Sequence, residues 1–117
     1  MAATIAVACV AMLHTAFLIL EMFLWTKPSG RRIFGTTREF AQQTAVLAAN
    51  QGLYNGFLAA GLVWGLIPRQ PSSDISVFFL VCVIVAGVYG GLTVKPAVFL
   101  VQALPGAIAL LLVLQSG

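Results

Sequence analysis

Charged side chains are scarce in this chain: they make up 8% of its 117 residues, with six lysines and arginines against three acidic residues. Hydrophobic residues supply 61% of the sequence, and the mean hydropathy is +1.04. A water-soluble domain of this length could not cover so much apolar surface with so few polar groups. The sequence therefore predicts an integral membrane protein, whose net charge of +3 reports loop topology and not nucleic-acid binding.

Cysteine and histidine are also rare, with two cysteines and one histidine. Cys9 and Cys82 form no C-x-x-C motif, so a thiol redox centre is not expected. One histidine and one glutamate inside the apolar runs are too few for a catalytic metal shell, and no glycine-rich phosphate loop follows a strand. We therefore expect neither a bound metal nor a cofactor.

Four apolar stretches are each long enough to cross a bilayer, which takes about 20 residues. They predict an all-α fold, a bundle of four transmembrane helices. The helices are expected at about 2–25, 37–67, 75–93 and 96–114. Because almost nothing is left over, residues 1–117 are expected to form a single membrane domain.

Two local signals refine these helices. Thr36, followed three residues later by Glu39, predicts a capping box that starts the second helix. Pro105 is expected to bend the last helix just after Gln102, because proline cannot donate a helical hydrogen bond.

Basic residues in short loops mark the cytoplasmic side of a membrane protein. Five basic residues lie in or beside the first loop, 26–36, and in the third loop. The second loop has only Arg69, whose charge is partly balanced by Asp74. The five are Lys27, Arg31, Arg32, Arg38 and Lys95. We expect both termini on the extracytoplasmic side of the bacterial inner membrane, with the lipid bilayer as partner and loop 26–36 in the cytoplasm. The run GRR would also suit an anionic-lipid or phosphate anchor.

Glu21 is the one acidic residue inside an apolar run, where a carboxylate costs several kcal/mol on insertion. That cost suggests an ion-pair, proton or ligand role. His14 lies two turns deeper on nearly the same helix face, because positions i and i+7 almost coincide. Since two turns span roughly 10 Å, a proton relay between His14 and Glu21 would need water.

Polar residues of the other three predicted helices lie at a depth comparable to that of Glu21. They are Asn50, Gln51, Tyr54, Asn55, Tyr89 and Gln102. Taken singly, the amides could be interhelical hydrogen-bond donors and the tyrosines interfacial anchors. Their shared depth instead favours a polar pocket that opens to the cytoplasm, with His14 near the midplane. The carboxyl of Glu21 could pair there with His14 or with donors such as Asn50 and Tyr54.

Four strings of the sequence resemble a known family. They are LEMFLWTKPSGRRIFG (20–35), LAANQGLYNGFLAAGLVWG (47–65), VAGVYGGLTV (85–94) and VQALPGAIAL (101–110). Over nearly its whole length the chain resembles the small bacterial four-helix membrane proteins catalogued as domain of unknown function thirteen-zero-four, some labelled "epimerase". The resemblance implies the same topology. It also implies that ten residues occupy positions of the family pattern, and it adds Trp25 and Thr93 to the residues expected to bind a ligand. The ten are His14, Glu21, Trp25, Asn50, Gln51, Tyr54, Asn55, Tyr89, Thr93 and Gln102.

Three functions stay open at this point. The pocket could bind or transport a small amphipathic or cationic ligand, with Glu21 supplying a charge or a proton. A membrane-embedded isomerase acting on a lipid-like substrate would use Glu21 and His14 as acid and base. The chain could also be a structural partner subunit, and its glycine-lined helix faces would suit a homodimer.

Overall fold

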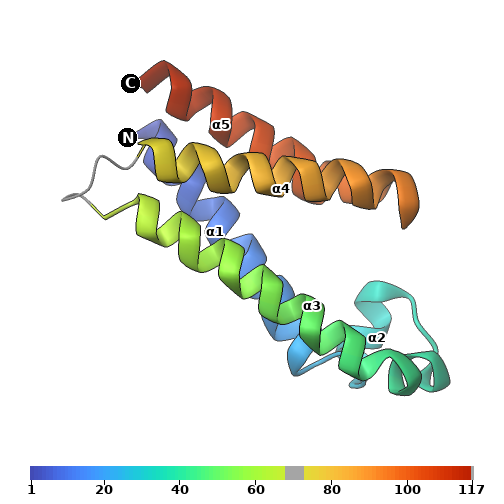
Figure 1. The fold of residues 1–117 in the computed structure, drawn as a ribbon. Coiled ribbons are helices and arrows are strands. Elements are labelled where there is room, and N and C mark those ends of the chain that lie inside the picture. The colour runs from blue at the N-terminus through green and yellow to red at the C-terminus, as the bar shows by residue number, and fades with distance from the viewer. Residues whose placement is uncertain (68–72, 117) are drawn as a thin grey trace. The chain divides into compact units, whose positions relative to one another are not determined.

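The computed structural model describes residues 1–67 and 73–116, and every regular element among them is helical. The elements are α1 (Ala2–Met22), α2 (Pro28–Phe34), α3 (Arg38–Gly65), α4 (Ser73–Thr93), the π-helix η1 (Phe99–Ala103) and α5 (Leu104–Ser116), as Figure 1 shows. The all-α prediction is confirmed. The expected first loop holds a short helix, α2, that the sequence did not predict.

Three of these helices are long and apolar enough to cross a membrane: Ala2–Met22, Ser73–Thr93 and Phe99–Ser116, the last combining η1 and α5. Helix α3 has 28 residues and is not one of them, because Asn50, Gln51 and Asn55 interrupt its apolar stretch. Length and composition thus support three spans.

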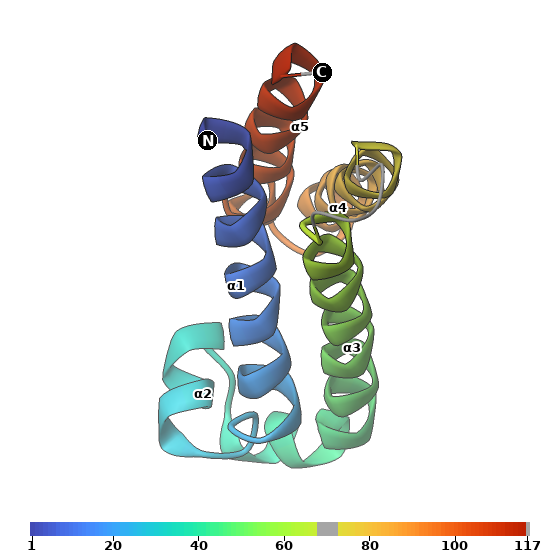
Figure 2. The same ribbon diagram turned by 90° about the vertical axis from the view of Figure 1, so that its left-hand side faces the viewer.

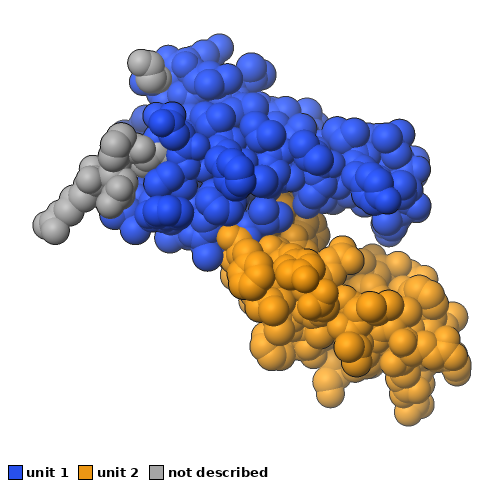
Figure 3. Space-filling model, in the orientation of Figure 1, with its two compact units in different colours: residues 1–12, 58–117 blue, residues 13–57 orange. Residues whose placement is uncertain are grey.

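The chain divides into two compact units, coloured separately in Figure 3. Unit 1 comprises Met1–Met12 and Leu58–Gly117, and unit 2 comprises Leu13–Phe57. Helices α1 and α3 each contribute a part to both units.

Unit 1 has the hydrophobic core of the chain, built from α1, α3, α4 and α5. Its buried members are Val7, Val10, Ala11, Leu62, Leu80, Val83, Ala109 and Val113. Glycines on α4 allow a close approach of the following helix: a Cβ on Gly87 would collide with Ala103, and one on Gly91 would lie 2.5 Å from the Phe99 ring. Helix α4 and the η1–α5 helix are therefore antiparallel and side by side (Figure 1).

The η1 segment lies just before Pro105, where a bend was predicted. The amide of Leu104 donates to the carbonyl oxygen of Phe99, five residues back, as a π-helix requires. Pro105 has no N–H and cannot bond to the carbonyl of Val101. The proline is thus accommodated by widening one turn, and Gln102 lies in that turn.

Unit 2 is a helical hairpin, formed by the second part of α1 and the first part of α3 (Figure 2). Gly56 faces Leu18, and Gly52 faces Glu21 and Met22, so the two helices are antiparallel. Helix α2 lies in the connection between them. It ends at Gly35, whose φ of 67° is the left-handed conformation that glycine adopts readily at a helix end.

The predicted capping box at the start of α3 is wrong by one residue. Helix α3 begins at Arg38, and the backbone amide of Phe40 donates to the hydroxyl of Thr37 at 3.1 Å. Thr37, not Thr36, is therefore the N-cap residue. Two adjacent threonines offer the same side chain, and the sequence gives no reason to prefer the second.

Candidate functional site

A buried pair of polar side chains joins α1 and α3 in unit 2. Nδ2 of Asn55 donates to Oε1 of Glu21 at 2.5 Å. Glu21 is only 6% exposed and Asn55 only 8%. Asn55 is a neutral amide, so this bond satisfies one acceptor position of the carboxyl group without balancing a negative charge on it. The arrangement leaves that group able to attract a cation or to hold a proton.

Small residues on α3 bring the two helices close enough for this bond. Gly52, Asn55 and Gly56 lie on one face, because positions i, i+3 and i+4 of a helix are neighbours. A Cβ on Gly52 would lie 3.0 Å from Cβ of Glu21, and one on Gly56 would lie 2.5 Å from Cδ1 of Leu18. The paired glycines therefore act as a close-contact face, with Asn55 as its polar member.

His14 is fully buried on α1, seven residues before Glu21. Its ring packs edge-on against Phe17, with ring centroids 5.7 Å apart. His14 and Glu21 are therefore both withdrawn from the surface, two helical turns apart. Their use as an acid and base pair stays a prediction.

Trp25 lies just beyond the end of α1 and is hydrogen-bonded to α3. Its Nε1 donates to Oγ1 of Thr44 at 3.0 Å, and that hydroxyl donates in turn to the carbonyl oxygen of Phe40 at 2.7 Å. The indole also packs on Phe34 of α2, at a centroid distance of 4.9 Å. Trp25 thus joins all three helices of unit 2. The sequence did not single out Thr44, because its contact with Trp25 comes from residues 19 positions apart in the chain.

The other predicted polar site residues of α3 are not buried as Asn55 is. Asn50, Gln51 and Tyr54 are exposed, and the Tyr54 ring lies 5.8 Å from that of Phe57. The sequence suggests Asn50 and Tyr54 as possible donors to Glu21, but the donor in the structure is Asn55. At 100° per residue, Asn50 and Tyr54 are turned by about 140° and about 100° from Asn55, so they lie on other faces of the helix. Gln51 is turned by only about 40° from Asn55, but its side chain is exposed.

Tyr89, Thr93 and Gln102 belong to unit 1. Tyr89 and Thr93 are exposed near the end of α4, where the Thr93 hydroxyl donates to the carbonyl oxygen of Tyr89 at 2.7 Å. Gln102 is half-buried in η1. Their predicted convergence with Glu21 stays a prediction.

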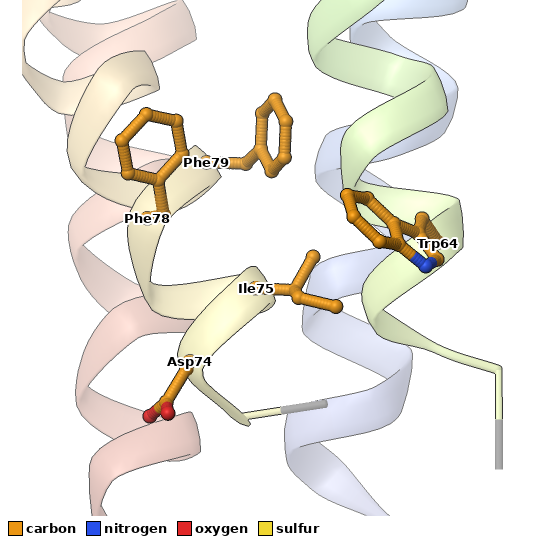
Figure 4. A pocket seen from close by; sticks show the side chains of 5 residues that line it. All are labelled: Trp64, Asp74, Ile75, Phe78 and Phe79. Atoms are coloured by element: carbon orange, nitrogen blue, oxygen red, sulfur yellow. The ribbon is translucent and has the colours of Figure 1, made fainter. Parts of the chain in front are cut away.

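Unit 1 has a hollow of about 310 Å³ that contains none of the predicted site residues. It lies between the end of α3 and the start of α4 and is lined by Trp64, Asp74, Ile75, Phe78 and Phe79 (Figure 4). Nearly all of its lining is apolar. Within residues 1–67 and 73–116, no group of three His, Cys, Asp or Glu side chains could hold a metal ion.

Residues 8–114 match the family described as "Protein of unknown function (DUF1304)". The chain belongs to this family. The DUF1304 match includes every residue of the predicted site, from His14 to Gln102. It confirms the resemblance found in the sequence.

A relative of this DUF1304 protein is the "Uncharacterized protein YpaA" of Lactococcus lactis subsp. lactis (strain IL1403). The two are 29% identical over 99 residues, which cover 83% of this chain and 81% of the relative. No solved structure matches the chain significantly.

Proposed function

We propose that this protein is a four-span protein of the bacterial inner membrane that binds or transports a small amphipathic or cationic ligand. The ligand site is the cytoplasmic half of the bundle, around Glu21 and Asn55. The observation that carries the proposal is the buried Glu21 carboxyl group, bonded to the neutral amide of Asn55. A cationic ligand would supply the charge that this amide does not.

The packing of α3 supports a fourth span. Helix α3 is antiparallel to α1 in unit 2, and in unit 1 its Gly61 and Gly65 face Phe79 and Ser76 of α4. Both α1 and α4 are apolar enough to cross the bilayer. At about 1.5 Å per residue, the 28 residues of α3 reach about 42 Å, beyond the roughly 30 Å of a hydrocarbon core. A helix that long beside two spans is most simply a span itself.

The loop charges support the proposed orientation. Lys27, Arg31 and Arg32 lie between α1 and α3, and Lys95 lies between α4 and η1. With four spans these two connections share a side, which the positive charges assign to the cytoplasm. Both termini are then extracytoplasmic, and Glu21 lies near the cytoplasmic end of α1.

Exposed side chains of α3 support an amphipathic ligand. Asn50 and Gln51 offer amide donors and acceptors in the middle of an otherwise apolar helix, where polar groups need partners. The neighbouring pair Tyr54 and Phe57 offers aromatic rings, which attract organic cations. A homodimer, which would also give Asn50 and Gln51 partners, remains a separate proposal.

The test uses tetraphenylphosphonium, a lipophilic cation, as the probe for purified protein in lipid nanodiscs. Glu21→Gln keeps the shape of the side chain and removes its charge, and we expect it to weaken binding by about tenfold or more. Glu39→Gln is the matched control, because Glu39 is exposed in the first turn of α3. Its affinity should equal that of the native protein.

Two outcomes would overturn the proposal. Equal loss of binding in both variants would show a general charge effect, and unchanged binding in Glu21→Gln would show that its carboxyl group is not part of the site. Counterflow of the labelled cation into proteoliposomes then separates a carrier from a binding protein. A carrier accumulates label inside the vesicles, and Glu21→Gln does not.

A further inference from the structure

Helix α2 and its flanks form the most basic surface of unit 2. Lys27 precedes the helix, Arg31 and Arg32 lie in its last turn, and Arg38 begins α3. Glu39 is the one acidic residue in this stretch. Lys27, Arg32 and Arg38 are exposed, so their charges are available to a partner.

The backbone of this region is held firmly in place. Gly30 is buried against the end of α1, and a Cβ there would collide with the carbonyl oxygen of Leu24. One turn later on the same face of the helix, the Phe34 ring packs on Trp25. Trp25 is bonded to Thr44 of α3. Helix α2 is therefore packed against the hairpin, and this packing fixes the backbone positions of its arginines.

Two buried polar atoms of this region lack a hydrogen-bond partner. Among the described residues, Arg31 Nε and Thr36 Oγ1 are the buried side-chain atoms in that state. The backbone amide of Thr36 donates to the carbonyl oxygen of Arg31, so the two residues are neighbours in space. Burying a polar atom without a hydrogen-bond partner is unfavourable, because the atom loses its bonds to water and gains none in return. Two such atoms beside a basic cluster are consistent with a bound group that accepts hydrogen bonds.

Exposed apolar side chains lie close in sequence to these basic residues. Phe23 is 64% exposed, Ile33 59% and Phe40 49%. Exposed aromatic and aliphatic side chains beside a cluster of basic residues suit the boundary between lipid head groups and acyl chains. A free inorganic phosphate would leave these apolar side chains without a role.

We propose that the α2 region, Lys27 to Arg38, binds the head-group phosphate of an anionic phospholipid from the cytoplasmic leaflet. The phosphate oxygens accept from Arg31 Nε and from the hydroxyl of Thr36, and Lys27 and Arg32 supply further positive charge. Phe23, Ile33 and Phe40 contact the acyl chains. The guanidinium group of Arg31 suits this role, because its planar fork matches phosphate geometry.

Tryptophan fluorescence can test this site separately from the ligand site at Glu21. The chain has two tryptophans, and Trp64→Phe leaves Trp25 as the one reporter, packed on α2. The full-length protein in detergent is titrated with brominated phosphatidylglycerol, brominated phosphatidylcholine and inorganic phosphate. We expect saturable quenching by phosphatidylglycerol at concentrations where phosphatidylcholine quenches weakly and inorganic phosphate does not compete.

Variants then assign the binding to Arg31. Arg31→Gln should weaken phosphatidylglycerol binding by about tenfold, as expected for loss of a hydrogen bond to a charged group. Arg31→Lys should recover part of that loss, because it keeps the charge without the fork. Lys95→Gln is the matched control, removing one positive charge outside unit 2. It should bind like the native protein.

Three results would overturn the proposal: equal affinity for the two lipids, effective competition by inorganic phosphate, or equal losses in Arg31→Gln and Lys95→Gln. Failure of Arg31→Gln to fold would be recognised from its circular dichroism. Arg32→Gln, at an exposed position, would then decide the question by the same titration.

Discussion

The amide of Asn55 on α3 donates to the carboxyl group of Glu21 on α1 at 2.5 Å, and both side chains are more than nine-tenths buried. The bond lies on the glycine face of α3, where Gly52 and Gly56 permit close approach of α1. It therefore has two effects. It fixes how α1 and α3 align in unit 2, and it orients the carboxyl group that we propose as the centre of the ligand site.

Asn55→Leu should destabilise the protein by about 2–3 kcal/mol, because it leaves the buried Glu21 carboxyl group without its donor. Asn50→Leu is the matched control at an exposed position of the same helix, and its stability should change by about 0.5 kcal/mol or less. Both can be measured as unfolding free energies in mixed micelles titrated with dodecyl sulfate.

The double variant Glu21→Leu with Asn55→Leu sharpens this expectation. Removing both partners leaves no unpaired buried group, so much of the stability lost in Asn55→Leu should return. If the double variant were less stable than Asn55→Leu, the cost would come from packing and not from an unsatisfied carboxyl group.

Gly52→Ala should also destabilise unit 2, by about 1–3 kcal/mol, because overpacking forces the neighbouring groups apart. The new Cβ would lie 2.8 Å from Cγ of Met22 and 3.2 Å from the carbonyl oxygen of Leu18. The sign of the change in unfolding free energy is informative, because Gly→Ala at an open helix position stabilises a protein by up to about 1 kcal/mol. Gln51→Ala, at the adjacent exposed position, should be close to neutral in the same unfolding measurement. A stabilised Gly52→Ala variant would show that α1 and α3 do not approach closely.

Much of the fold could be predicted from the sequence because apolar length alone marks a span. That signal located α1, α4 and the η1–α5 helix to within a few residues. Helix α2 was missed because its seven residues are too few to show a helical period. The cap of α3 was misplaced because Thr36 and Thr37 are chemically equivalent candidates.

The candidate site was predictable only in part. Depth along the helices picked out Glu21 and a polar stretch of α3, but depth says nothing about direction around a helix. The face could have been chosen from the small residues: Gly52 and Gly56 flank Asn55 at helical spacing. No such pattern marks Thr44, whose contact with Trp25 depends on how α1 and α3 pack.

Thr44→Val should cost about 1–2 kcal/mol, because it leaves the indole N–H of Trp25 without its acceptor while keeping the side-chain shape. Thr93→Val is a close control. Each hydroxyl donates to the carbonyl four residues earlier, but only that of Thr44 also accepts from Trp25. The exposed Thr93 should tolerate the change within about 0.5 kcal/mol. Trp25 emission in the Trp64→Phe background should shift in Thr44→Val alone, and equal effects in both variants would contradict a role for Trp25 in joining the helices.

The number of spans determines on which side of the membrane each terminus lies. If α1, α3, α4 and the η1–α5 helix all cross, the two termini share a side; if α3 does not, they lie on opposite sides. We expect alkaline phosphatase, which is active outside the cytoplasm, to be active when fused after Gly117, and green fluorescent protein fused there to be dark. The same pair of reporters inserted between Gly35 and Thr36 should give the reverse result, because basic residues in a short connection favour the cytoplasmic side. A fluorescent fusion after Gly117 together with a cytoplasmic α1–α3 connection would leave three spans. It would also remove Asn55 and its bond to Glu21 from the transmembrane bundle, so the proposed ligand site depends on this outcome.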